Sequence, residues 1–207
     1  MPVITKLLAT KDNNIKVYVD KKFAFTLSPN EVVEHRLNKG TNLSIKKLSS
    51  LQERGNYEKY YLKSLNLISY RPRSKHEIMN YLSRQSVASE NISKIIETLT
   101  GQGYLNDFDF ALVFTNSKVN QKQRGPQRIR QELLSKGIST EIINQVFTQV
   151  FPDQESLLDL AQRALSKKSK AFSRLSPEQL RHKTYQYLNR QGFDYTTINT
   201  LLADFID

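Results

Sequence analysis

Few residues of this chain could do catalytic chemistry, and the first candidates are a pair of carboxylates. Asp107 and Asp109 are separated by one residue, a spacing at which two carboxylates can bind the magnesium ion of a nuclease. They also stand at the expected start of a helix, where a carboxylate satisfies free backbone N–H groups and the helix dipole. We therefore favour helix capping for both residues, and a metal-dependent nuclease is the least favoured function.

The histidines and the known catalytic motifs give no active site. His35, His76 and His182 are the only histidines, and none has a metal-binding neighbour three or four residues further along its helix. The sequence contains no cysteine, and it also lacks a G-x-x-x-x-G-K phosphate loop, a G-x-S-x-G turn and an H-E-x-x-H segment. We therefore expect that the protein is not an enzyme and uses no cofactor or metal.

Basic residues show the strongest pattern in the sequence. The 31 lysine and arginine residues outnumber the 20 aspartate and glutamate residues, which gives a formal net charge of +11. Such an excess favours polyanionic partners, namely nucleic acid, an acidic protein face or an anionic membrane. The basic side chains gather in three clusters, which are Arg71, Arg73 and Lys75; Lys118, Lys122, Arg124, Arg128 and Arg130; and Lys167, Lys168, Lys170 and Arg174.

The elements that must position these clusters form an internal repeat. Moving the central third of the chain by 51 residues in either direction brings apolar positions into register. Ile129, for example, falls on Ile78 toward the N-terminus and on Leu180 toward the C-terminus. After a four-residue insertion, Gly137 falls on Gly192. Tandem units that share an apolar register are typical of helical repeat proteins.

We predict a mainly α fold in which three tandem three-helix repeats form an elongated, curved array, preceded by a small β-meander plus short helices. The meander follows from the alternation of apolar and polar residues in 1–27, with turns at 12–14 and 20–22. The predicted segments are 1–55 for the N-terminal β-hairpin or meander and short helices, 56–104 for repeat 1, 105–151 for repeat 2 and 152–207 for repeat 3.

Two short helices are expected between the meander and the first repeat. Segment 28–31 (Ser-Pro-Asn-Glu) has the pattern of a capping box and predicts a helix that ends near Gly40. A second helix is predicted to begin at about Ser44 and to end before Gly55, because glycine commonly stops helices. A separate helix over 57–69 would then open the first repeat.

The three basic clusters fall at equivalent points of the repeats, beside the start of each middle helix. Stacked repeats would align them as one basic stripe, because equivalent positions of a repeat array share a face. Arg128 and Arg130 flank the apolar Ile129, so both are expected to point to the sides of a helix whose inner face is buried. The alternative is that each cluster is a solvated loop, but the threefold recurrence favours a binding site.

Four segments carry, in order, the pattern of a known family. They are Arg-x-Arg-Ser-x-x-Glu-Ile at 71–78, Gly-Tyr-Leu-x-Asp-x-x-Phe-Ala at 103–111, Gly-Pro-x-x-Ile-x-x-Glu-Leu-x-x-Lys-Gly-Ile at 125–138 and Tyr-Leu-x-Arg-x-Gly-Phe at 187–193. Together they resemble the signature segments of RecX, a family of bacterial regulators of the RecA recombinase. The likeness covers 57–207, and the preceding segment resembles the extended N-terminus of some Gram-positive members. Gln191 departs from the pattern, because an arginine is common there.

The resemblance implies tandem three-helix repeats that lie in the groove of the RecA–DNA filament and inhibit its activities: ATP hydrolysis, strand exchange and the SOS and recombination responses. It implies the RecA recombinase, the RecA–single-stranded DNA filament and single-stranded DNA as partners, with double-stranded DNA as a further candidate. It assigns no contact residues, so the basic stripe as the binding site is an inference from the sequence itself.

The main alternative is a direct DNA-binding protein of the helix-turn-helix type. Segments 75–84 and 89–100 could form such a pair of helices, although neither carries the set of Arg, Asn and Gln side chains expected for reading base edges. No apolar run is long enough to span a membrane, and the N-terminus has no signal-peptide pattern. We expect a cytoplasmic, monomeric protein without a membrane partner.

Overall fold

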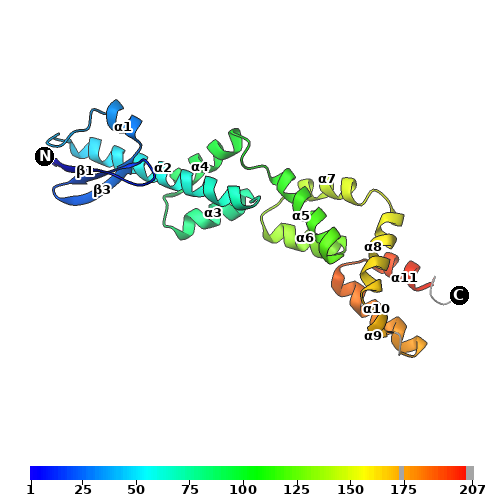
Figure 1. The fold of residues 1–207 in the computed structure, drawn as a ribbon. Coiled ribbons are helices and arrows are strands. Elements are labelled where there is room, and N and C mark those ends of the chain that lie inside the picture. The colour runs from blue at the N-terminus through cyan, green and yellow to red at the C-terminus, as the bar shows by residue number, and fades with distance from the viewer. Residues whose placement is uncertain (173–174, 204–207) are drawn as a thin grey trace. The chain divides into compact units, whose positions relative to one another are not determined.

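The computed structural model describes residues 1–172 and 175–203 (Figure 1). The chain divides into two compact units: unit 1 consists of Met1–Pro72 and Ile78–Tyr104, and unit 2 consists of Arg73–Glu77 and Leu105–Asp207. The mainly helical fold that the sequence predicts is confirmed. In chain order the elements are β1 (Ile4–Ala9), β2 (Ile15–Val19), β3 (Lys22–Leu27), α1 (Pro29–Glu34), α2 (Ile45–Tyr70), α3 (Lys75–Arg84), α4 (Ser89–Gly101), α5 (Asp107–Lys122), α6 (Pro126–Ser135), α7 (Thr140–Val150), α8 (Gln154–Ser166), α9 (Ser169–Phe172), α10 (Pro177–Gln191) and α11 (Tyr195–Ala203).

The predicted meander is present in unit 1 as a three-stranded antiparallel sheet in the order β1–β2–β3. Val17 of β2 lies opposite Leu7 of β1 and Phe25 of β3. Asp20 and Lys21 have left-handed backbone conformations, with φ of 49° and 66°, as a two-residue hairpin turn requires. Because side chains alternate between the two faces of a strand, one face builds a core with the helices that follow. This core comprises Ile4, Val17, Val19, Phe25, Leu27, Val32, Leu37, Leu43 and Leu51.

The prediction of two separate helices on either side of Gly55 is wrong, because α2 is continuous over 26 residues. A Cβ atom at Gly55 would lie 2.5 Å from the carbonyl oxygen of Thr26 and 3.3 Å from Cβ of Phe25. This glycine therefore allows α2 to approach β3 closely, and it does not end the helix. The boundary proposed between residues 55 and 56 falls inside α2, and the segment limits stay a proposal.

The first helix, α1, is also shorter than predicted, since it ends at Glu34 and not near Gly40. Arg36 has a left-handed backbone with φ of 51°, which interrupts the helical geometry two residues later. Leu37 then turns into the core of unit 1, where it is buried. The stop thus comes from the need to bury a leucine and not from the glycine.

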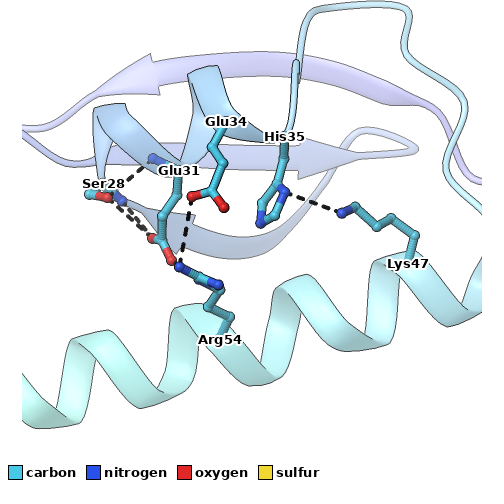
Figure 2. Close-up of polar contacts among 6 residues, drawn as sticks. All are labelled: Ser28, Glu31, Glu34, His35, Lys47 and Arg54. Atoms are coloured by element: carbon cyan, nitrogen blue, oxygen red, sulfur yellow. Dashed lines mark hydrogen bonds and ion pairs between the residues drawn. The ribbon is translucent and has the colours of Figure 1, made fainter.

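Polar contacts tie α1 to α2 (Figure 2). The capping box predicted for α1 is confirmed, because the carboxylate of Glu31 accepts a hydrogen bond from the backbone N–H of Ser28 at 3.2 Å. The guanidinium of Arg54, on α2, donates to the same carboxylate. Close by, Nζ of Lys47 lies 3.2 Å from Nδ1 of His35. The bonds from Ser28, at the start of α1, and from Arg54, on α2, thus satisfy the carboxylate of Glu31, which is 93% buried.

Unit 2 contains two three-helix repeats, each with its own core. Helices α5, α6 and α7 enclose Phe110, Ala111, Ile129, Leu133, Ile138, Ile143 and Val146, and helices α8, α10 and α11 enclose Leu160, Ala161, Ala164, Leu188, Phe193, Ile198, Leu201 and Leu202. The predicted burial of Ile129 and Leu133 is confirmed. In the third repeat Thr184 and Leu188 are buried, whereas Leu180, the predicted match of Ile129, is only half-buried. The four-residue insertion therefore precedes these core positions, and α10 has 15 residues where α6 has 10.

Candidate nucleic-acid interface

The start of α6 is docked against the end of α10 by backbone hydrogen bonds. The N–H of Gly125 donates to the carbonyl oxygen of Gln191 at 2.9 Å, and the N–H of Gln127 donates to that of Gly192 at 3.0 Å. A Cβ atom at Gly125 would lie 2.5 Å from the carbonyl carbon of Gly192. Two glycines thus let the helix ends meet. Backbone N–H groups at the start of α6 donate to carbonyl oxygens at the end of α10, and both kinds of group lack partners within their own helix.

The start of α3 meets the end of α6 in an equivalent way. The hydroxyl of Ser74 donates to the carbonyl oxygen of Lys136 at 2.8 Å. A Cβ atom at Gly137 would lie 2.4 Å from Cβ of His76, so this glycine also permits a close contact. In both cases a middle helix begins where the middle helix of the next repeat ends. The two junctions are therefore similar in their contacts, whereas the equivalence of the basic clusters beside them stays a prediction.

Three residues of the second basic cluster converge on one carboxylate, that of Glu132 in α6. Nη1 of Arg124 donates to Oε1 of Glu132, and Nζ of Lys118 lies 3.4 Å from Oε2. Nε of Arg128 lies 3.5 Å from Oε1, one helical turn before Glu132. Three positive charges against one negative leave an excess of two. The side chain of Arg124 is 16% exposed and that of Arg128 is 41% exposed, so Arg128 is the more accessible to a ligand.

The other two residues of this cluster lie apart from Glu132. Nη2 of Arg130 donates to Oδ1 of Asn144 at 2.8 Å, and its guanidinium lies 5.1 Å from the ring centroid of Phe147. These partners belong to α7, whereas those of Arg128 belong to α6 and α10, so the two arginines diverge from Ile129 as predicted. Lys122, in the last turn of α5, is exposed.

The first cluster is divided between the two units. Arg71 belongs to unit 1, where its Nη1 donates to the carbonyl oxygen of Pro72 at 3.0 Å, while Arg73 and Lys75 belong to unit 2. Lys75 donates its backbone N–H to Oδ1 of Asp107 at 2.9 Å. In the third cluster Lys167, Lys168 and Lys170 are exposed, and Arg174 lies outside the described residues. The alignment of all three clusters as one stripe stays a prediction.

The two aspartates considered for metal binding are both engaged at helix starts. Asp107 accepts the bond from Lys75, so it caps α3, while the side chain of Asn106 caps α5. Oδ2 of Asp109 accepts from Nδ2 of Asn106 at 2.7 Å. Helix capping by these aspartates was expected from the sequence, but the helix that Asp107 caps, α3, was not. Across 1–172 and 175–203 no three His, Cys, Asp or Glu side chains are grouped so that they could hold a metal ion.

Two further charged residues at the α3–α6 junction were missed from the sequence. Nζ of Lys136 lies 2.7 Å from Oε1 of Glu77, and both side chains are largely buried. The ammonium group of Lys136 also lies 5.9 Å and 5.4 Å from the ring centroids of Phe110 and Phe114. The pair joins positions 59 residues apart, so no local spacing could reveal it. Glu132, by contrast, follows Arg128 at the helical i+4 spacing and could have been found.

Comparisons with known proteins agree with this architecture. Family models for the first, second and third three-helix domains of RecX match residues 61–99, 106–146 and 154–202. The chain is 31% identical to "Regulatory protein RecX" of Bacillus licheniformis over 208 residues, which cover 99% of this chain and 78% of that protein. It is 27% identical to the protein of the same name from Lactobacillus johnsonii, over 100% of this chain and 76% of the relative.

Solved structures of RecX proteins also match this chain. A crystal structure of regulatory protein RecX matches 99% of this chain and 100% of its own with a TM-score of 0.75 at 26% identity. That of RecX from Lactobacillus salivarius matches 72% of this chain and 95% of its own with a TM-score of 0.65 at 25% identity. Among the residues that the structure describes, no helix has the length and apolar character to cross a membrane.

Proposed function

The chain belongs to the RecX family of regulatory proteins, and from this we propose that it is a non-enzymatic negative regulator of the RecA recombinase. In this proposal the repeats bind in the groove of the RecA–single-stranded DNA filament through basic side chains. Binding inhibits ATP hydrolysis, strand exchange and the SOS and recombination responses. The partners are RecA, its filament, single-stranded DNA and, as a further ligand, double-stranded DNA, and the protein acts as a cytoplasmic monomer.

The observation that carries this proposal is the excess of positive charge at the start of α6. Lys118, Arg124 and Arg128 share a single carboxylate, so an anionic ligand can approach without first displacing a balanced ion pair. A guanidinium that is 41% exposed, such as that of Arg128, can bind a phosphate with two parallel hydrogen bonds. Gly125 and Gly192 let the start of α6 approach the end of α10, and backbone hydrogen bonds join the two helix ends beside this charge.

A sequence-reading protein of the helix-turn-helix type is less well supported. The second helix of each pair would have to enter a DNA groove and carry side chains that anchor it to phosphates. Helix α7 has neither lysine nor arginine among its eleven residues. In α4 the only such residue is Lys94, whose Nζ lies 2.6 Å from Oε1 of Glu90. In these two pairs the basic clusters lie beside the first helix, and the one cation of a second helix is paired with a glutamate.

The test is the rate of RecA-dependent ATP hydrolysis on single-stranded DNA at increasing concentrations of this protein. The proposal predicts that the rate falls as the protein binds, and that strand exchange falls with it. A parallel titration with duplex fragments measures binding without RecA. Unchanged hydrolysis, together with sequence-dependent binding to duplex DNA, would favour the helix-turn-helix alternative.

A further inference from the structure

A mainly apolar cavity of about 420 Å³ lies within the third repeat, among α8, α9, α10 and α11. Its walls are formed largely by Leu165, Phe172, Pro177, Leu180 and Leu202. Pro177 and Leu180 belong to the start of α10, where this helix is longer than its counterpart α6. The insertion that distinguishes the third repeat from the second therefore supplies part of the cavity wall.

The aromatic wall of the cavity is held in place by its neighbours. The rings of Phe172 and Tyr187 meet edge to face, with 6.4 Å between their centroids. Burial raises the pKa of the Tyr187 hydroxyl, and this hydroxyl donates to the carbonyl oxygen of Ala164 at 3.2 Å. Nζ of Lys168 lies 5.7 Å from the centroid of the same tyrosine ring. The ring of Phe172 thus lines the cavity, and a cation lies beside the tyrosine against which this ring packs.

One basic residue lines the cavity, and others lie close to its lining residues in the sequence. Arg181 lines the cavity itself and is exposed. Segment 163–172, which leads into it, contains four basic residues and no acidic residue, and its Lys167 and Lys168 are exposed. An apolar hollow with a cationic rim complements a ligand that has a flat apolar face and is joined to anionic groups.

We propose that this cavity takes an unstacked base of single-stranded DNA while the cations at its rim contact the neighbouring phosphates. The proposal rests on the proposed function and names a contact within it. An aromatic side chain beside a positively charged groove is the usual arrangement for binding single strands without sequence preference, because every base offers a flat π face. In a duplex the faces of the bases are stacked on one another, so a single strand is the form that can enter.

The experiment uses the full-length protein with a tryptophan reporter. The chain contains no tryptophan, so Phe172→Trp places the only indole in the wall of the cavity. An unlabelled 20-nucleotide single strand should quench the indole fluorescence as a base stacks on the ring. A strand of equal length in which all the bases are absent carries the same phosphates, and it should bind in low salt without quenching. Equal quenching by both strands, or by neither, contradicts the proposal.

Affinity gives a second measurement that does not depend on the reporter. Ser166 is an exposed residue that lines the cavity, so Ser166→Phe should narrow the cavity without altering the core. Its matched control is Ser83→Phe in α3, because each hydroxyl donates at 2.9 Å to a carbonyl of its own helix and both residues are exposed. The affinity of Ser166→Phe for the normal strand should fall about 5- to 150-fold, the range for loss of one stacked base.

The possible outcomes separate this inference from the proposed function. Loss of affinity in Ser166→Phe only, down to the level of the strand without bases, supports the cavity as a base site. If the normal strand and the strand without bases bind equally and with the same salt dependence, the base site is refuted and phosphate binding remains. If neither strand nor the RecA filament binds, both proposals fail. If Ser166→Phe weakens binding to the RecA filament but not to the bare single strand, the cavity binds protein and the inference is refuted.

Discussion

Replacing Arg128 and Arg124 one at a time should separate ligand binding from stability. Both contact Glu132, but the side chain of Arg128 is 41% exposed and that of Arg124 is 16% exposed. A phosphate can therefore reach Arg128, whereas Arg124 mainly holds the carboxylate. We expect Arg128→Ala to weaken binding of single-stranded DNA and Arg124→Ala to weaken the fold.

The magnitudes follow from the contacts. Loss of one phosphate contact should reduce the slope of log affinity against log salt concentration by about 0.7 on single strands and about 0.9 on duplex DNA. Arg128→Ala also removes an exposed i,i+4 ion pair and a hydrogen bond of 2.9 Å to the carbonyl oxygen of Arg190, so unfolding should cost about 1 kcal/mol less. Arg124→Ala removes a charge-assisted hydrogen bond from a largely buried site, so its free energy of unfolding should fall by about 1.5–3 kcal/mol.

The assay is a salt titration of binding to a labelled single strand, with chemical unfolding of each variant. Arg84→Ala, in the last turn of α3 and outside the three clusters, is the control for removing a charge. It should change neither the slope nor the stability appreciably. An unchanged slope for a folded Arg128→Ala variant would refute the assignment of Arg128. A reduced slope for Arg124→Ala without loss of stability would reverse the roles of the two arginines.

Three further predictions concern the fold and the chemistry. Leu133 is fully buried, so Leu133→Ala should lower the free energy of unfolding by about 2–5 kcal/mol in a denaturant titration; a loss well under about 1 kcal/mol would contradict its burial. Burial and the neighbouring carboxylate of Glu31 raise the pKa of Glu58 to about 7, from 4.5. The stability that depends on protonated Glu58 is thus complete below pH 4.5 and is lost as pH rises through about 7. Thermal unfolding measured from pH 5 to 8 should therefore show a fall in stability, and Glu58→Gln should reduce that fall. Equal pH dependence in the wild type and the variant would exclude Glu58 as the origin of the fall. Replacing Asp107 and Asp109 by Asn should leave function intact, because asparagine also caps helices, and labelled DNA incubated with Mg²⁺ or Mn²⁺ should stay uncut; cleavage that the double variant lacks would identify a nuclease.

Much of the fold could be predicted because its signals are local. Strand alternation in residues 1–27 and the helical register of Ile129 and Leu133 depend on a few neighbouring positions. Gly55 was misread because its role is tertiary: the residue stands inside a helix, and only the approach of Thr26 explains the missing side chain. The insertion in the third repeat was placed too late for a similar reason, since Leu180 is as apolar as the core residues but lies at the cavity.

The basic residues of the candidate site could be named from the sequence, but their ion pairs and hydrogen bonds could not. The convergence of Lys118 and Arg124 on Glu132 depends on how α5 and α6 pack, which the sequence does not specify residue by residue. The bond from Lys75 to Asp107 likewise spans 32 residues. The similar spacing of the basic clusters could be recognised from the sequence, because equivalent positions recur from one repeat to the next.

The most direct test of the account is binding of the labelled protein to preassembled RecA filaments on single-stranded DNA. Bare single strands of the same length and RecA without DNA are measured in parallel at one salt concentration. We predict the highest affinity for the filament, with Arg128→Ala binding it more weakly than the wild type does. Filament affinity no higher than that for the bare strand, or no binding to the filament at all, would contradict it.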